Sequence, residues 1–351
     1  MATVIQVDPE RPDAGDIGRA AEVLRGGGLV AFPTETVYGL GAHALDRAAV
    51  RRLFEAKGRP SIDPLIVHIA SVEQLATLAA AVPETARLLA ARFWPGPLTL
   101  VLPRGASVPH DVTAGLETVA IRVPSHPVAR ALLEAARIPV AAPSANLFSR
   151  PSPTRASHVL DDLAGRIDLV LDGGPTPVGV ESTVVDLSGD VPRVLRPGAV
   201  SLEALRQVLP RVDLRDARGA GDEAGAMASP GLLPMHYAPR APLTLYHGDA
   251  ASLGDALLGG VRLAIAEGRR VGVLATAEDA AAVRGLPVVV AELGSAHDAD
   301  EVAARLYAAL RELDAAQVDL ILACDLPTDA GLWRALRDRL RRAAARLIAV
   351  G

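Results

Sequence analysis

Lysine and asparagine each occur once in this chain, at Lys57 and Asn146, although 36 residues are basic. The other 35 basic residues are arginine, whose guanidinium is a wide planar fork, whereas an ammonium is a compact point charge. A site that needs the point charge would resist replacement by arginine. Lys57 and Arg59 are two residues apart, and such a pair suits a polyphosphate. A solvated helix end, where cations are also favourable, explains a bare pair of this kind at least as well.

Two loops at the ends of apolar runs carry further polar groups. Pro143-Ser144-Ala145-Asn146 follows the run 140–142 and offers a hydroxyl, an amide and backbone N–H groups, although a plain turn would look similar. Residues 33–40 place Thr34, Glu35, Thr36 and Tyr38 at a strand exit. Loops at strand exits are where α/β folds bind ligands.

One arginine stands on a predicted strand. Alternation in 119–123 puts Arg122 on the face opposite to its apolar neighbours. This position suits bidentate binding of a carboxylate, but a surface arginine on a half-exposed sheet is equally compatible with the pattern. Glu181-Ser182-Thr183 and Arg196-Pro197-Gly198 stand at the two ends of a predicted hairpin, 183–187 with 193–195.

Alternating strand and helix patterns predict an α/β chain with two domains. The first, 1–210, has strands at 29–32, 65–69, 98–102, 119–123, 169–172 and 183–187, and a helix that Asp46 caps and Gly58 ends. A linker or lid is predicted at 211–240, where 215–228 is rich in Gly, Asp and Ala without periodicity. Residues 241–351 predict a small Rossmann-like parallel sheet, with strands at 243–246, 271–275, 287–291 and 318–323 and helices at 251–266, 300–315 and 331–348.

Composition excludes several classes of protein. Residues 1–205 carry 19 basic and 22 acidic side chains and the whole chain has a formal charge of -5, so stable nucleic-acid binding is not expected. Cys324 is the single cysteine, which rules out a disulfide within the chain and a cysteine-based zinc site. No long apolar run or signal-peptide pattern is present, so we expect a cytoplasmic protein away from membranes. We also find no Ser-His-Asp set or Walker loop, and His68, on an apolar strand, is typical of a core histidine.

In order and spacing, the motifs at 33–40, Lys57-x-Arg59, 120–124, 143–146, 181–183 and 196–198 together resemble the YrdC-like threonylcarbamoyl-AMP synthase family. The resemblance covers about 10–205. Ser229-Pro230-Gly231 and His236-Tyr237-Ala238-Pro239, followed by a small α/β domain, resemble the two-domain branch of that family. The resemblance implies a YrdC-like twisted mixed sheet with helices, followed by the small Rossmann-like domain.

The resemblance also implies an enzyme, a nucleotidyltransferase that joins L-threonine, bicarbonate and ATP with Mg²⁺ into threonylcarbamoyl-AMP and pyrophosphate. The product would pass to a tRNA threonylcarbamoyl transferase, for modification of adenosine next to the anticodon. The implied L-threonine site comprises Thr36, His68, Arg122, Ala142 and Ser182. The implied ATP site comprises Lys57, Arg59, Asp63, Thr118, Ser144, Asn146, Ser152, Arg196 and Tyr237, with Lys57 and Arg59 as catalytic cations.

One residue departs from the family's pattern. The family usually has asparagine where this chain has Asp63, which would either repel a phosphate or help to hold Mg²⁺. The metal ligands therefore stay open.

Two other functions are compatible with the fold. A double-stranded RNA-binding module would need a basic surface, against which the charge balance argues. A carbamoyltransferase of the hydrogenase-maturation type would need cysteine-rich zinc modules, which a single cysteine excludes.

Overall fold

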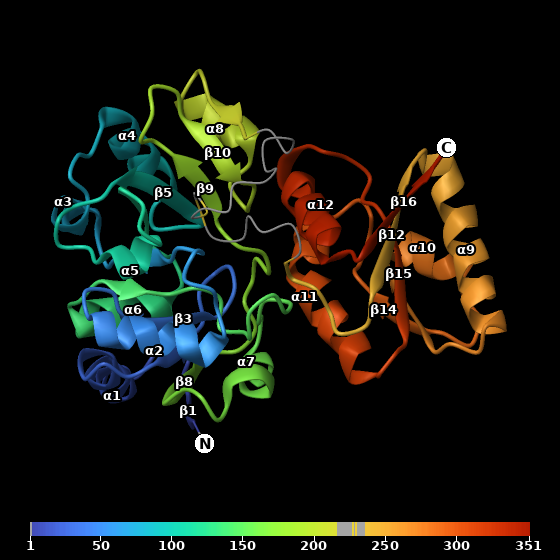
Figure 1. Ribbon diagram of the computed structural model, residues 1–351, viewed down its shortest axis with the longest axis horizontal. Helices are drawn as coiled ribbons and strands as arrows, with labels where there is room; N and C mark the ends of the chain where they lie inside the picture. Colours follow the sequence, from blue (N-terminus) through green and yellow to red (C-terminus); the bar gives the residue numbers. More distant parts are fainter. Residues whose placement is uncertain (1, 216–226, 228, 230–235) are drawn as a thin grey trace. The chain divides into compact units, whose positions relative to one another are not determined.

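The computed structural model describes residues 2–215, 227, 229 and 236–351, which divide into two compact units (Figure 1). The first unit holds 1–148, 153–177 and 181–232, and the second holds 149–152, 178–180 and 233–351. Two short loops inside the predicted first domain thus belong to the second unit. Most of the predicted linker and lid, at 216–226, 228 and 230–235, lies outside the described residues.

Eleven described strands of the first unit form one mixed sheet in the order β1-β8-β2-β3-β7-β4-β6-β5-β9-β10-β11. The sheet contains both parallel and antiparallel pairs of strands, so it is a mixed sheet, as predicted. The strands are β1 (Thr3–Gln6), β2 (Val30–Phe32), β3 (Gly39–His43), β4 (Ile66–His68), β5 (Leu98–Pro103), β6 (Thr118–Arg122), β7 (Val140–Ala141), β8 (Leu169–Asp172), β9 (Thr183–Asp186), β10 (Arg193–Arg196) and β11 (Asp213–Leu214).

Helices bury both faces of this sheet. In β2, Val30 and Phe32 join one apolar cluster and Ala31 joins another, so successive residues face opposite cores. Helices α1 and α6 pack together over the first of these clusters. The helices are α1 (Ala14–Arg25), α2 (Arg47–Lys57), η1 (Val72–Gln74), α3 (Leu75–Leu78), α4 (Glu84–Phe93), α5 (His110–Thr113), α6 (Pro127–Ala136), α7 (Ala156–Leu163) and α8 (Leu202–Val208).

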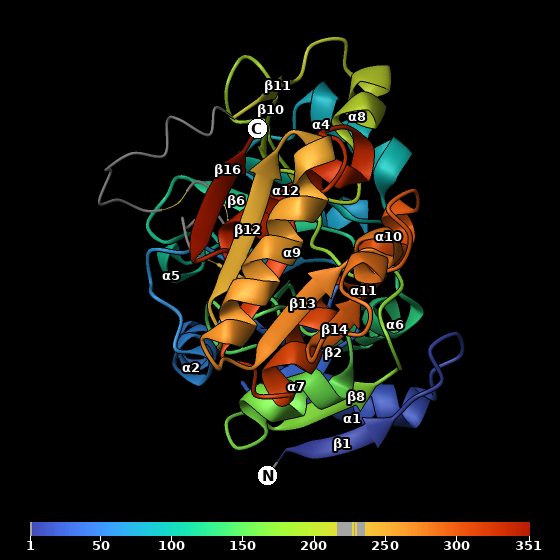
Figure 2. The ribbon, with the colours of Figure 1, turned by 90° about the vertical axis from the view of Figure 1, so that its right-hand side faces the viewer.

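The second unit contains a five-stranded sheet in the order β14-β13-β15-β12-β16, which is parallel as predicted but has one strand more than the four expected. Figure 1 shows α9 and α10 on one side of this sheet and α11 and α12 on the other, and Figure 2 shows α9 lying across it. Its elements are β12 (Leu243–Gly248), α9 (Ala250–Ala266), β13 (Val271–Ala275), α10 (Ala277–Ala282), β14 (Val289–Glu292), α11 (Ala299–Ala315), β15 (Leu320–Cys324), α12 (Gly331–Ala343) and β16 (Arg346–Val350).

The helix predicted at 331–348 is wrong at its carboxyl end. Helix α12 stops at Ala343, and residues 346–350 form β16, which pairs with β12 in parallel. A helical period that continues past the last turn concealed this edge strand, because tertiary pairing overrides local pattern.

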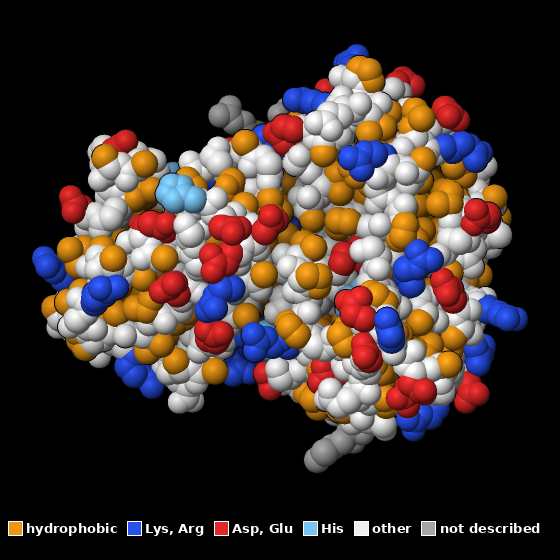
Figure 3. Space-filling view, turned by 180° about the vertical axis from the view of Figure 1, so that it is seen from behind, with side chains coloured by type: hydrophobic (Ala, Val, Ile, Leu, Met, Phe, Trp, Pro, Cys, Tyr) orange, Lys and Arg blue, Asp and Glu red, His pale blue; other side chains and the backbone are white. Residues whose placement is uncertain are grey.

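Surface charge is mixed. On the face that Figure 3 shows, Lys and Arg side chains are interspersed with Asp and Glu side chains rather than gathered into a stripe. None of the described helices is both long and apolar enough to cross a bilayer.

Candidate active site

A row of polar side chains borders a small apolar cluster on one face of the first unit's sheet. The cluster contains Ile66, Val101, Ala120, Val184 and Leu195. His68 on β4 and Arg122 on β6 each lie two residues beyond a member, and Thr99 on β5 and Ser182 before β9 each lie two residues ahead of one. Residues two apart on a strand share a face. Strands β4 and β6 pair with His68 opposite Arg122, so four neighbouring strands present these groups together.

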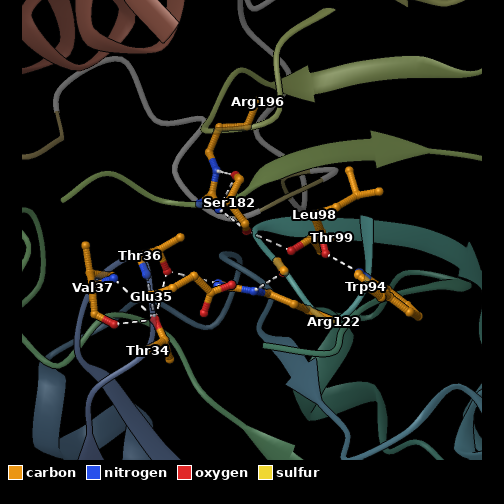
Figure 4. Close-up of polar contacts among 11 residues, drawn as sticks. Thr34, Glu35, Thr36, Val37, Trp94, Leu98, Thr99, Arg122, Ser182 and Arg196 are labelled. Carbon is orange, nitrogen blue, oxygen red and sulfur yellow. Dashed lines mark hydrogen bonds and ion pairs between the residues drawn. The ribbon is translucent and has the colours of Figure 1, made fainter. Parts of the chain in front are cut away.

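Arg122 lies at the middle of this row. It is only 4% exposed, so the interpretation as a surface arginine is wrong. Figure 4 shows its guanidinium reaching the loop that follows β2. Nε donates to the Gly96 carbonyl at 3.2 Å, Nη1 donates to the Thr36 hydroxyl at 3.1 Å, and Nη2 lies 2.7 Å from Glu35 Oε1. A buried guanidinium held on a strand is well suited to bind a carboxylate.

The hydroxyls of the loop after β2 have a fixed direction. Thr34 Oγ1 donates to the Val37 carbonyl at 2.6 Å, so it accepts from Thr36 Oγ1, which lies 2.8 Å away. A hydroxyl has one hydrogen. The Thr36 hydrogen is therefore committed to Thr34, and Thr36 can only accept further hydrogen bonds.

Arg196 and Ser182 bring the two ends of the hairpin together. Arg196 Nη2 donates to the Ser182 carbonyl at 3.0 Å and to its hydroxyl at 3.1 Å, and that hydroxyl lies 2.8 Å from Thr99 Oγ1. Gly198 permits this approach, since an added Cβ would lie 2.3 Å from the Thr183 nitrogen. Strands β9 and β10 form the antiparallel hairpin that was predicted.

His68 is 3% exposed and uncharged at neutral pH. Burial lowers the pKa of His68 to about 3, and the nearby Arg122 charge acts in the same direction. Its Nδ1 has no hydrogen-bond partner in the described part of the chain. His68 is thus a buried histidine, as expected, but an incompletely satisfied one, so it offers a neutral polar atom to the site.

Lys57 holds the loop that contains Asn146. Asp46 caps α2 through the Ala48 N–H, and Gly58 ends the helix with a φ of 62°. Nζ of Lys57 then donates to the carbonyls of Ser144 at 2.5 Å and Asn146 at 2.6 Å. The side chain is 2% exposed, and its burial, followed by the Arg59 charge, lowers the pKa of Lys57 well below its usual value.

Arg59 and Asp63 form a buried pair, 8% and 0% exposed. Arg59 Nη2 lies 2.9 Å from Asp63 Oδ1, and its guanidinium also donates to the carbonyls of Asp63 at 3.0 Å and Pro64 at 2.7 Å. The carboxylate therefore offsets the Arg59 charge. In the described part of the chain, no cluster of three or more His, Cys, Asp or Glu residues could hold a metal ion.

The remaining predicted residues are more dispersed. Ala142 is buried, and its N–H donates to the Ile66 carbonyl at 2.9 Å. Thr118 begins β6, four residues from Arg122. Ser152 and Tyr237 belong to the second unit, where both are buried and Tyr237 packs on Tyr307 with ring centroids 5.5 Å apart.

Three residues beside Arg122 and Ser182 were not assigned from the sequence. The sequence indicates Glu35 only as part of its loop, and it indicates no role for Thr99 or Gly96. A threonine inside the apolar run 98–102 was the signal for Thr99, since polar residues in a buried strand need a partner.

Each of the two units matches a known protein family, and the same relatives contain both. Residues 22–198 match the Sua5, YciO and YrdC family model described as telomere recombination, and residues 200–345 match the C-terminal domain model of threonylcarbamoyl-AMP synthase. Threonylcarbamoyl-AMP synthases of Pyrococcus abyssi and Bacillus subtilis are 45% and 47% identical to the chain, covering 98% and 93% of it and 98% and 92% of their own lengths.

A solved structure is similar over the same extent. Sua5 of Pyrococcus abyssi complexed with L-threonine superimposes with a TM-score of 0.93 at 44% identity, and the match covers 100% of both chains.

Proposed function

The chain belongs to the threonylcarbamoyl-AMP synthase family in its two-domain form, and from this premise we propose how its first unit works. The reaction converts L-threonine, bicarbonate and ATP into threonylcarbamoyl-AMP, pyrophosphate and water. In class it is a nucleotidyl transfer, because an adenylyl group moves to the carbamate. The observation that carries this function is the buried guanidinium of Arg122, which stands on a polar row beside the Thr36 hydroxyl.

The amino acid would bind along that row. Its carboxylate would meet Arg122, and Ser182, His68 and the backbone at Ala142 would surround the rest. Bicarbonate and the amine of threonine form the carbamate with loss of water, and a carbamate oxygen then attacks the α-phosphate of ATP and expels pyrophosphate. The carbamate is the nucleophile and ATP carries the leaving group, so the protein has to orient these two molecules and to neutralise charge.

The nucleotide would bind near the cations at the end of α2. Arg59 would face the phosphates with Arg196, and Lys57 would act through the loop 144–146 that it holds. The implied ATP residues Asp63, Thr118, Ser152 and Tyr237 stay predictions. The described carboxylates do not assemble a Mg²⁺ site, because Asp63 is paired with Arg59, so we propose that Mg²⁺ binds mainly through the phosphates of ATP.

The product is an activated adenylate that water hydrolyses, so we propose a direct transfer to a tRNA threonylcarbamoyl transferase. We also propose that this reaction takes place in the cytoplasm, where ATP and tRNA are both available. The relatives that match the full chain give no support to the double-stranded RNA-binding alternative, and the mixed charges in Figure 3 do not favour it.

Mass spectrometry of the purified protein with L-threonine, ¹³C-bicarbonate and ATP tests the function. We expect threonylcarbamoyl-AMP carrying the ¹³C label, formed together with pyrophosphate. Omission of any one substrate should abolish both. Pyrophosphate release that does not depend on threonine would contradict the proposed reaction.

A further inference from the structure

Glu35 and Arg122 leave matched polar atoms open at the same place in the site. Glu35 is 6% exposed and Arg122 is 4% exposed. Glu35 Oε1 and Arg122 Nη2 form an ion pair at 2.7 Å, whereas Glu35 Oε2 has no hydrogen-bond partner in the described residues. Buried polar groups left in this way are costly unless a ligand completes them. Glu35 Oε2 therefore lacks a donor, and Arg122, whose five N–H groups make three contacts here, can still donate to an acceptor.

The Thr36 hydroxyl adds a second open acceptor. It already receives Arg122 Nη1 at 3.1 Å and gives its hydrogen to Thr34. Only a donor can use its remaining lone pair. Two acceptors, Glu35 and Thr36, thus lie side by side at the terminal nitrogens of the guanidinium (Figure 4).

The surroundings of Glu35 also favour a cation. Glu35 lines a cavity of about 780 Å³ in the first unit, together with Glu10, His126 and Asp172. His126 Nδ1 accepts from the Val128 N–H as the cap of α6, so this nitrogen carries no proton. Burial lowers the pKa of His126 and so keeps the ring neutral, although the charges of Glu35 and Glu10 act in the opposite direction. The cavity lining is therefore acidic around the Glu35 carboxylate.

An α-amino acid zwitterion presents the two missing groups at the required closeness. Its carboxylate is an acceptor and its ammonium carries three donors, two bonds apart. We propose that Glu35, with Thr36, binds the ammonium group of L-threonine while Arg122 binds its carboxylate. This assignment rests on the proposed function and makes Glu35 the residue that selects an amino acid over other carboxylic acids.

A purely structural role for Glu35 predicts something different. If the carboxylate only positioned Arg122, its loss would weaken every carboxylate ligand to a similar degree. If it binds the ammonium, only ligands with an amine should suffer. The deaminated analogue of L-threonine, (R)-3-hydroxybutanoate, retains the carboxylate and the hydroxyl and separates the two roles.

The experiment compares binding of L-threonine and (R)-3-hydroxybutanoate to the full chain and to Glu35→Gln by calorimetry, with competition for the weaker ligand. We expect Glu35→Gln to weaken L-threonine at least about 30-fold, as loss of one partner of a buried charge pair does. Binding of (R)-3-hydroxybutanoate should stay within about threefold of wild type. Glu134→Gln removes an exposed carboxylate of α6 that lines neither the cavity nor the surroundings of Arg122, and it should change neither affinity.

Equal weakening of both ligands, or no weakening of L-threonine, would overturn the assignment. If Glu35→Gln does not fold, Glu35→Asp keeps the charge but withdraws it by one methylene, and the same selective loss is expected. A wild-type protein that binds no L-threonine would refute the proposed function itself and remove the basis of this inference. Binding that survives in wild type but responds equally for both ligands refutes only the role of Glu35.

Discussion

Lys57 and Asn146 are joined by a hydrogen bond of 2.6 Å, in which the lysine side chain donates to the backbone carbonyl of the asparagine. The same ammonium binds the Ser144 carbonyl, and the Phe148 N–H donates to the Lys57 carbonyl at 2.9 Å. These hydrogen bonds therefore fix the loop 144–148 to the end of α2. Asn146 Nδ2 donates to the Leu147 carbonyl at 2.7 Å, so its amide supports the same loop.

The first prediction concerns this ammonium. Lys57→Arg should lower turnover by about 10²-fold, because a planar fork cannot occupy the space of an ammonium between two carbonyls. Lys57→Ala should do the same, since it leaves both carbonyls without this donor. Steady-state pyrophosphate release measures the effect, and Arg51→Lys on the exposed face of α2 is the control. Full activity of Lys57→Arg would show that charge alone suffices.

Asp63 gives a prediction that separates two roles. Two backbone carbonyls hold Arg59 in addition to Asp63, so Asp63→Asn should leave the Arg59 side chain in place. The positive charge of its guanidinium would then no longer be offset by a carboxylate. The KM for ATP should then fall by about fivefold, equivalent to about 1 kcal/mol of removed repulsion. Initial rates at several Mg²⁺ concentrations test this. A raised Mg²⁺ requirement, with a higher KM, would instead make Asp63 a metal ligand.

The helix α2, the three long helices of the second unit and the longer strands were predictable because burial and period agree in them, whereas the other helices of the first unit were not predicted. Strand β3 was not predicted, since Gly39 and Gly41 argue against a strand. At Gly41 an added Cβ would lie 2.9 Å from both Phe32 and Val140, so close packing of neighbouring strands selects the glycine. Strand β1 was missed as well, because only Ile5 of its four residues is buried.

The candidate site shows the same division. Arg122, Ser182 and Thr36 were predicted because a motif surrounds each of them. Two of the contacts that define the site, Arg122 with Glu35 and Ser182 with Thr99, join residues 87 and 83 positions apart. Sheet order creates those contacts, and no local pattern encodes it. For the same reason nothing in the sequence indicated that the loops 149–152 and 178–180 belong to the second unit.

Replacement of Arg122 should affect one substrate more than the other. Arg122→Ala should raise the KM for L-threonine much more than the KM for ATP if, as we propose, the guanidinium binds the amino-acid carboxylate. A rise of about 10²-fold is the size expected for a lost buried charge pair. Initial rates with each substrate varied in turn give both constants, and Arg130→Ala on the exposed side of α6 is the matched control. Equal increases in the two KM values would place Arg122 at the phosphates.

The last prediction follows from the burial of His68. Its pKa is about 3 in the folded chain and near 6.5 when unfolded, so only the unfolded chain takes up a proton as the pH falls below 6.5. The stability that neutral His68 contributes is complete above pH 6.5 and is lost progressively towards pH 3. Between pH 7 and pH 5 the free energy of unfolding should fall by about 2 kcal/mol on account of this residue.

Urea unfolding of wild type and His68→Asn at both pH values isolates that amount, since the difference between the two proteins cancels other titrating groups. His110→Asn, which replaces an exposed histidine, is the control. A difference between wild type and His68→Asn that does not change with pH would mean that His68 accepts its proton while buried, and the site would then hold a second cation beside Arg122.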